Sequence, residues 1–145
     1  MIAIACDHGG YALKETVKKH LLELGYEVRD FGTDSLDSCD YPDYAALAAQ
    51  AVADGTCEKG IVICTTGIGV SIVANKINGI RCALCSDILS AEMTRRHNDT
   101  NMLAMGAGIV GSNLALAIVD KWLTTEFEGG RHQRRVDKIM ALEQR

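Results

Sequence analysis

Residues 60–71 read Gly-Ile-Val-Ile-Cys-Thr-Thr-Gly-Ile-Gly-Val-Ser, and this stretch decides the fold. Its first half, Gly60–Thr65, is a run of apolar and β-branched residues without polar alternation, which predicts a strand buried on both faces. The glycines that follow, Gly67 and Gly69, allow a tight turn into a helix that we expect at Ser71–Lys76. A buried strand that leads directly into a helix is the repeating unit of parallel α/β sheets.

The same alternation of strand and helix extends to both ends of the chain. Leu13, Val17 and Leu21 recur at helical spacing, and Gly25 follows them as a helix-ending residue. We therefore predict an α/β fold, a single-domain αβα sandwich of the Rossmann-like, doubly wound kind, with a five-stranded parallel sheet and one domain over residues 1–145. The predicted strands are Met1–Cys6, Glu27–Phe31, Gly60–Thr65, Arg81–Cys85 and Met102–Met105. The predicted helices are one that ends at Gly25, one from Pro42 to Gly55 with Tyr44, Leu47, Ala48 and Ala51 on its apolar face, and Ser71–Lys76, Asp87–Asn98, Asn113–Thr124 and Arg134–Gln144.

Composition and charge limit the possible classes of protein. The chain has 145 residues, of which 48% are hydrophobic and 23% charged, which is enough for one core and excludes a disordered chain. The net charge is −4, and residues 131–145 form one basic end, with five Lys and Arg against Asp137 and Glu143, so we expect no nucleic-acid partner. No basic stretch precedes Asp7, and no apolar run is long enough to cross a bilayer. We therefore expect a cytoplasmic protein with no membrane partner.

The six cysteines are expected to be reduced thiols. Cys82 and Cys85 have the spacing of a redox pair, but in a strand they would point to opposite faces of the sheet, which disfavours a redox role. The four histidines have no cysteine or second histidine at metal-ligand spacing. We therefore expect no metal site.

Polar and nucleophilic residues stand near the ends of the predicted strands, where ligands bind in open parallel sheets. Asp7 and His8 follow the first strand, Cys64 belongs to the third, and His97 and Asn98 end the fourth helix. We expect all of these residues at one edge of the sheet. The loop after Cys64 presents backbone N–H groups at a helix N-terminus, which favours an anion and makes a thiol there a usable base or nucleophile. Taken singly, each residue is equally explained by helix capping or a turn.

The stretch Gly106-Ala-Gly108-Ile-Val-Gly111 matches the Gly-x-Gly-x-x-Gly pattern of dinucleotide sites. It follows the last predicted strand, however, so no later strand places an acidic residue on a ribose. The loop at 64–71 also lacks the lysine of a nucleoside-triphosphate site. A non-catalytic module that binds a nucleotide or a sugar phosphate is therefore an alternative and not the leading interpretation.

Five short motifs, spread over the whole chain, carry a resemblance to a known family. They are Asp7-His8-Gly9-Gly10, Asp40-Tyr41-Pro42, the Cys-x-Thr-Gly-x-Gly-x-Ser of residues 64–71 leading to Ala74-Asn75-Lys76, Arg95-x-His97-Asn98-Asp99, and Phe127-Glu-Gly-Gly-Arg131-His132. With these motifs the chain resembles the type B ribose-5-phosphate isomerases, a family that includes the galactose-6-phosphate isomerase subunits.

The resemblance implies an aldose–ketose isomerase that acts on a sugar phosphate without a metal or an organic cofactor. It also implies a homodimer, which in some members pairs into a tetramer, with the helix of about residues 131–145 packed on the partner. Cys64 would be the base that moves a proton between C1 and C2, His97 would open the sugar ring, and Thr66 and Asp7 would move hydroxyl protons. The implied substrate-binding residues are Asp7 and Tyr41, His8, Arg131 and Arg135 at the phosphate, and Asn98 with the amides of Thr65, Thr66, Gly67, Ile68 and Gly69 at the enediolate.

Two positions depart from the family pattern. Thr65 stands where members usually have glycine, and Gly108 stands where most have an arginine that contacts phosphate. A weaker or rearranged phosphate site is expected as a result. The leading interpretation is interconversion of ribose 5-phosphate and ribulose 5-phosphate. The alternatives are isomerisation of another sugar, either a six-carbon aldose 6-phosphate such as galactose or allose 6-phosphate or an unphosphorylated aldose.

Overall fold

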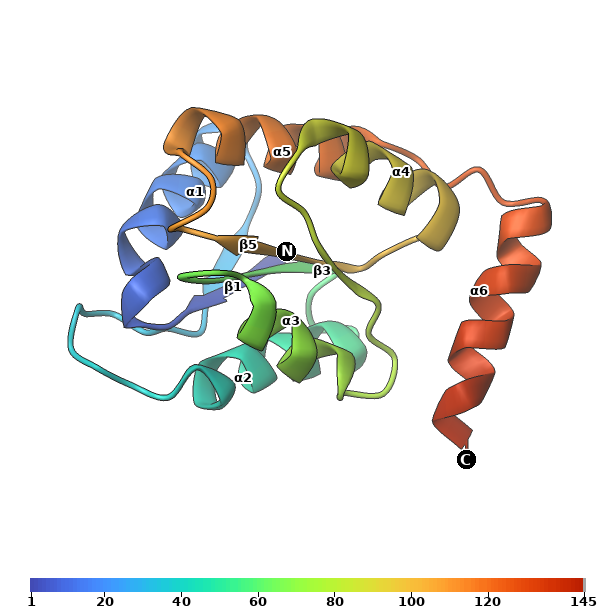
Figure 1. The fold of residues 1–145 in the computed structure, drawn as a ribbon, viewed down its shortest axis with the longest axis horizontal. Helices are drawn as coiled ribbons and strands as arrows, with labels where there is room; N and C mark the ends of the chain where they lie inside the picture. Colours follow the sequence, from blue (N-terminus) through green and yellow to red (C-terminus); the bar gives the residue numbers. More distant parts are fainter. Residues whose placement is uncertain (145) are drawn as a thin grey trace.

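The computed structural model describes residues 1–144, which form a five-stranded sheet with the strand order β2-β1-β3-β5-β4 (Figure 1). Every neighbouring pair of strands is parallel, which confirms the predicted fold class. The strands are β1 (Ile2–Cys6), β2 (Val28–Asp30), β3 (Lys59–Cys64), β4 (Cys82–Leu84) and β5 (Met102–Gly106). The helices are α1 (Tyr11–Glu23), α2 (Tyr41–Ala53), α3 (Ile68–Asn75), α4 (Ile88–Asn98), α5 (Ser112–Thr124) and α6 (Arg131–Ala141), with short 3₁₀ turns η1 (His8–Gly10) and η2 (Leu142–Gln144).

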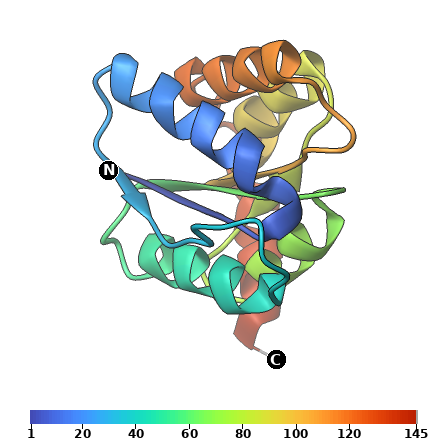
Figure 2. The same cartoon turned by 90° about the vertical axis from the view of Figure 1, so that its left-hand side faces the viewer.

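Helices cover both faces of the sheet (Figure 2). The core residues of α1, α4 and α5 pack on one face, and those of α2 and α3 pack on the other. Along β3, Ile61 and Ile63 belong to the first core cluster, whereas Val62 and Cys64 belong to the second. This alternation is what a strand buried on both faces requires. It directs the Cys64 thiol toward the side of the sheet that α2 and α3 cover.

The two edge strands are shorter than the sequence predicts. β2 and β4 have three residues each and are partly exposed, because an edge strand has a neighbour on one side only. The predicted strands Glu27–Phe31 and Arg81–Cys85 therefore overrun the observed pairing at both ends. The prediction that Cys82 and Cys85 point to opposite faces is confirmed, since each belongs to a different core cluster.

Two helices begin three residues earlier than predicted. α3 starts at Ile68 and not at Ser71, and α6 starts at Arg131 and not at Arg134. In α3, Ser71 lies in the first turn and donates its hydroxyl to the Ile68 carbonyl oxygen (2.7 Å). A serine that bonds back to the preceding turn resembles an N-cap in sequence, which explains the shifted prediction.

The buried face of α2 includes Ala48 and Ala51, as predicted, but not Leu47. Leu47, expected on the apolar face, is 47% exposed, whereas Ala45, Ala48 and Ala49 are buried. The small alanines let α2 approach the sheet closely, and the larger leucine remains outside.

The last helix, α6, stands away from the sheet at one end of the molecule (Figure 1). It packs mainly against α4, and its buried residues are His132 and Val136. Arg145, the last residue of the predicted C-terminal segment, lies outside the described residues. None of the helices formed by residues 1–144 combines the length and the apolar composition that a membrane crossing needs.

Candidate functional site

Cys64 is the last residue of the central strand β3 and is 6% exposed. The backbone N–H of Gly67 donates a hydrogen bond to its Sγ atom (3.1 Å). Gly67 has a φ of 78°, and a Cβ atom there would lie 2.7 Å from the carbonyl carbon of Met105, so this turn requires glycine. The sulfur therefore sits in a rigid turn with a backbone N–H donor directed at it.

The loop from Cys64 into α3 presents further polar groups. The side chains of Thr65 and Thr66 are exposed, and the Thr66 hydroxyl accepts a hydrogen bond from the Ile68 amide (3.3 Å). The Ile68 amide is thus engaged, whereas the amides of Gly69 and Val70, also in the first turn of α3, have no acceptor within the helix and are available to an anionic ligand. Tyr41 borders the same loop, because a Cβ atom on Gly69 would lie 2.7 Å from its Cζ atom.

Asp7 and His8 lie beside this loop, at the end of β1. β1 pairs with β3, and the Asp7 amide donates to the Ile63 carbonyl oxygen (3.3 Å). The buried Asp7 carboxylate accepts from the Gly10 amide (3.1 Å). The His8 Nδ1 atom accepts from the Cys39 amide (3.2 Å), which leaves Nε2 as the nitrogen that faces a ligand. β1 and β3 are adjacent strands, and the helices that follow them lie on opposite faces of the sheet. The crevice at the carboxyl ends of two such strands is the usual ligand site of parallel α/β sheets.

Thr65 lies between two glycines. A Cβ atom on Gly9 would collide with the Thr65 hydroxyl, and one on Gly108 would lie 3.1 Å from the Thr65 Cγ2 atom. The Gly108 amide also donates to the Thr65 carbonyl oxygen (2.8 Å). Thr65 thus fills the space that glycine at positions 9 and 108 leaves open, and the two departures from the family pattern are in contact.

The expectation that His97 and Asn98 lie at the same edge as Cys64 is wrong. α4 runs from the carboxyl end of β4 to the amino end of β5, so its last residues return to the opposite edge of the sheet (Figure 1). The contact between the Gly60 amide and the Asn101 carbonyl oxygen (3.0 Å) fixes this end beside the start of β3. Within one chain, the two groups of residues are therefore separated by the length of β3 from Gly60 to Cys64. This is about 13 Å of extended backbone.

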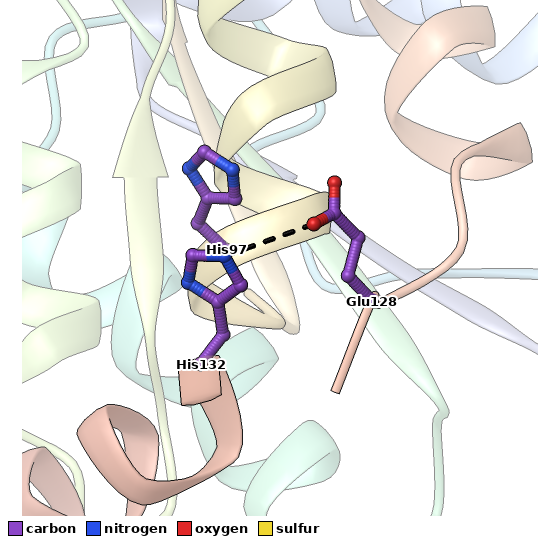
Figure 3. A group of neighbouring side chains, drawn as sticks. All are labelled: His97, Glu128 and His132. Atoms are coloured by element: carbon purple, nitrogen blue, oxygen red, sulfur yellow. Dashed lines mark ion pairs between the residues drawn. The ribbon is translucent and has the colours of Figure 1, made fainter. Parts of the chain in front are cut away.

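At this second edge His97 meets residues that are distant in sequence (Figure 3). Its ring stacks on that of His132, with centroids 4.2 Å apart and planes inclined by 15°. The Glu128 carboxylate approaches the Nε2 atom of His132 at 3.7 Å. Arg131 and Arg135 of α6 are exposed next to this group. Spacing along the sequence could not reveal the pair, because the two histidines come from different helices.

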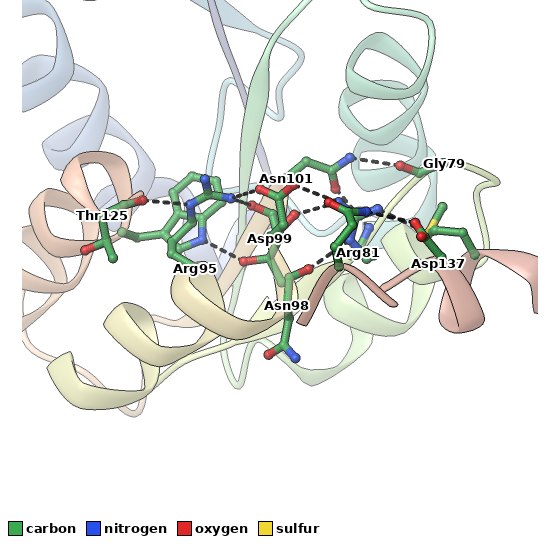
Figure 4. Close-up of polar contacts among 12 residues, drawn as sticks. Gly79, Arg81, Arg95, Asn98, Asp99, Asn101, Thr125 and Asp137 are labelled. Carbon is green, nitrogen blue, oxygen red and sulfur yellow. Dashed lines mark hydrogen bonds and ion pairs between the residues drawn. The ribbon is translucent and has the colours of Figure 1, made fainter. Parts of the chain in front are cut away.

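A polar network holds the end of α4 in place (Figure 4). The Arg95 guanidinium donates to Asp99 Oδ1 (2.9 Å) and to the Thr100 carbonyl oxygen (2.6 Å). Arg81 donates to the carbonyl oxygens of Asn98 (2.9 Å) and Asp99 (2.7 Å). The Asn98 side-chain oxygen accepts from the Thr94 hydroxyl (3.1 Å), which leaves its NH₂ group for a ligand. Asn98 also lines a cavity of about 500 Å³ between β4, α4 and the C-terminal segment.

The fold and the carboxyl edge of the sheet define a class of protein. A parallel α/β sheet that carries a thiol, a carboxylate and helix N-terminal amides at its switch point is the framework of a small-molecule enzyme. The chain belongs to the ribose/galactose isomerase family, whose model matches residues 2–139. This confirms the resemblance seen in the sequence motifs.

Individual relatives match over almost the whole length. The ribose-5-phosphate isomerase B of Escherichia coli is 54% identical over 144 residues, which are 99% of this chain and 97% of that protein. The structure of the Clostridium thermocellum ribose-5-phosphate isomerase B has a TM-score of 0.98 at 54% identity and covers 99% of this chain and 97% of its own. The Mycoplasma genitalium ribose-5-phosphate isomerase B, solved with bound ribulose-5-phosphate, has a TM-score of 0.95 at 41% identity, with 99% and 95% covered.

Proposed function

We propose that this protein interconverts ribose 5-phosphate and ribulose 5-phosphate through an enediolate, with Cys64 as the base. The observation that carries the proposal is the Cys64 sulfur at the end of the central strand, bonded to the Gly67 N–H beside the amides of α3. A base next to preorganised oxyanion donors is what proton abstraction beside a carbonyl requires. The names of the relatives support the choice of substrate.

The reaction moves one proton between two neighbouring carbons and involves no net oxidation. The Cys64 thiolate takes the proton from C2 of the open-chain aldose, and the electron pair of that bond forms the enediolate. The amides of residues 65–69 hold the negative oxygen, and Thr66 and Asp7 move the hydroxyl proton between O1 and O2. The Cys64 thiol then returns its proton to C1, which gives the ketose and restores the thiolate.

A complete site needs two copies of the chain, because His97 and Asn98 lie at the edge of the sheet opposite Cys64, and Arg131 and Arg135 lie on α6, which packs against α4. In a homodimer with two-fold symmetry, the second copy brings these residues to the first copy's Cys64 and makes the same contact in return. Exposed apolar residues at both edges support such packing. They are Ile68 and Ile72 on α3, and Ile139 and Leu142 at the C-terminal end.

Phosphate binding falls to His8 of one copy and to Arg131 and Arg135 of the other, since Gly108 offers no side chain. Gly108 favours a second candidate, isomerisation of a six-carbon or an unphosphorylated sugar, because the arginine that contacts phosphate in the family pattern is missing there. A cytoplasmic location accompanies a sugar-phosphate substrate, because charged phosphate esters do not cross membranes unaided.

The direct test is turnover. Purified protein with ribose 5-phosphate is expected to form ribulose 5-phosphate, measured in a coupled assay, without added metal or cofactor. The comparison set is ribose, allose, allose 6-phosphate and galactose 6-phosphate. The highest kcat/KM with ribose 5-phosphate supports the proposal, and a higher value with an unphosphorylated or six-carbon sugar selects the second candidate.

A further inference from the structure

Three potential metal ligands meet at the amino edge of the sheet (Figure 3). His97 ends α4, Glu128 lies in the segment after α5, and His132 is in the first turn of α6. One ligand atom from each lies within 4.8 Å of the other two. Two imidazoles and a carboxylate form a donor set that suits Zn²⁺ and similar transition-metal ions, whereas Mg²⁺ and Ca²⁺ prefer oxygen ligands alone.

His132 supplies a second and independent observation. His132 is 6% exposed. Among residues 1–144, its Nε2 atom is the one buried side-chain nitrogen or oxygen without a hydrogen-bond partner. A buried nitrogen without a hydrogen-bond partner gains most from a ligand.

The distances are close to those of a zinc site. A cation at the centre of a triangle with sides of 4.8 Å lies about 2.8 Å from each corner, and Zn²⁺ needs about 2.0–2.2 Å. The exposed Glu128 side chain can move inward by this amount. The stacked rings must also tilt out of their parallel arrangement for both nitrogens to face one ion.

We propose that His97, Glu128 and His132 bind a divalent transition-metal ion of the Zn²⁺ type, and that this ion inhibits the enzyme. The inhibition rests on the proposed function, because the ion occupies the imidazole assigned to ring opening. Arg96, which lies 3.7 Å from Glu128, and Arg131 next to His132 oppose a cation. The site is therefore expected to bind at micromolar and not at nanomolar concentrations of the metal.

The binding part is tested by calorimetric titration of the metal-free protein with ZnCl₂. We expect one ion per chain, and an affinity that falls at least tenfold in Glu128→Gln and in His132→Gln. Glu126→Gln, which removes a nearby carboxylate outside the cluster, is the matched control and should bind like the wild type. Equal zinc affinity in the wild type and Glu128→Gln overturns the proposal, since Glu128 is on the surface and its variant should fold normally.

The inhibition part uses the same variants. Micromolar ZnCl₂ should inhibit the wild type and Glu126→Gln, and EDTA should reverse the effect. Glu128→Gln should keep its basal activity and resist zinc at these concentrations. Zinc inhibition of equal strength in Glu128→Gln assigns the effect to a thiol and overturns this part. If the protein shows no isomerase activity but binds zinc through Glu128, the metal site stands. Only the proposed function is then refuted.

Discussion

Cys64 differs from Cys6, Cys57, Cys82 and Cys85 in what surrounds its sulfur. Burial raises the pKa of Cys6 and Cys82 to about 12 and that of Cys85 to about 11, and it also raises the pKa of Cys57. These thiols stay protonated at neutral pH and are inert. Cys64 instead ends its strand in a turn, with the Gly67 N–H directed at the sulfur.

Replacing Cys64 by alanine should therefore remove the base. We expect Cys64→Ala to lower kcat by about 10²–10⁴-fold, because the proton between C1 and C2 then has no acceptor. Cys57→Ala and Cys82→Ala should keep near-normal rates in the same assay. Iodoacetamide, which alkylates thiols, should inactivate a Cys39→Ser variant. Saturating substrate should slow this loss of activity. Full activity of Cys64→Ala would assign the base to another residue.

His97 should matter only for substrates that form a ring. Ribose 5-phosphate cyclises, whereas the phosphate of erythrose 4-phosphate occupies the hydroxyl that would close a five-membered ring. His97→Asn is expected to lower kcat/KM for ribose 5-phosphate by about 10²-fold or more and to leave erythrose 4-phosphate within about threefold. Equal losses for the two sugars would place His97 in another step.

Thr65 and Gly108 should act as a pair. An arginine at position 108 adds a charge-assisted bond to phosphate, but its Cβ atom is crowded by Thr65. The double variant Thr65→Gly/Gly108→Arg should lower KM for ribose 5-phosphate by about 10–100-fold, and Gly108→Arg alone should gain less. KM for ribose should not change in either variant.

Gly111→Arg is the control for that pair, because a Cβ atom at Gly111 meets no atom within 4 Å. It adds the same charge to the same turn without the contact to Thr65. An equal fall in KM with Gly111→Arg would show that net charge, and not the position of the guanidinium, determines phosphate binding.

At the scale of the helices and strands, the sequence correctly predicts which residues come together directly after the ends of strands. Asp7, His8 and the 64–69 loop lie together, because each follows a buried strand whose direction the pattern reveals. The sequence misplaces His97, since a helix that returns to the next strand carries its last residues to the far edge. It also misses the stack of His97 on His132, because that contact depends on how α6 packs on α4.

One buried ion pair joins α1 to the end of β2. Lys14 is 1% exposed, and its ammonium group donates to Asp30 Oδ2 (2.7 Å), which also accepts from Lys18 (3.1 Å). Burial by itself would raise the pKa of Asp30, but the bonds from Lys14, the Gly32 amide and Lys18 outweigh it and lower the pKa below 3.8. The folded state therefore favours the ionised carboxylate.

The sign of the pH dependence follows from this shift. Asp30 contributes its full stability above the unfolded-state pKa of 3.8 and loses it as the pH falls through the lower folded-state value. Asp30→Asn should lower the free energy of unfolding by about 1–3 kcal/mol at pH 7, measured with urea, and the difference from the wild type should shrink below pH 3.8.

The control for Asp30→Asn is Glu23→Gln, which removes an exposed pair with Lys19 at 4.0 Å. Its free energy of unfolding should stay within about 0.5 kcal/mol of the wild type at both pH values. A difference between Asp30→Asn and the wild type that does not depend on pH would mean that packing, and not the charge, makes the contribution.

At the scale of the whole molecule, the position of the functional residues is the main feature of the structure. The thiol, the carboxylate and the amides lie at the carboxyl edge of the sheet, whereas the His97 imidazole lies at the amino edge and the arginines lie on α6. In the proposed mechanism these groups act on a single sugar phosphate, so they must come from two chains. We therefore propose that Cys64 of one copy works with His97 of another.

Mixing two inactive variants tests this claim most directly. When Cys64→Ala and His97→Asn are refolded together, half of the dimers contain one chain of each kind, and each mixed dimer has one site with an intact Cys64 and an intact His97. We predict recovery of about a quarter of the wild-type rate with ribose 5-phosphate, from two preparations that are nearly inactive alone. A mixture that forms mixed dimers but stays as inactive as its parents would contradict the shared site.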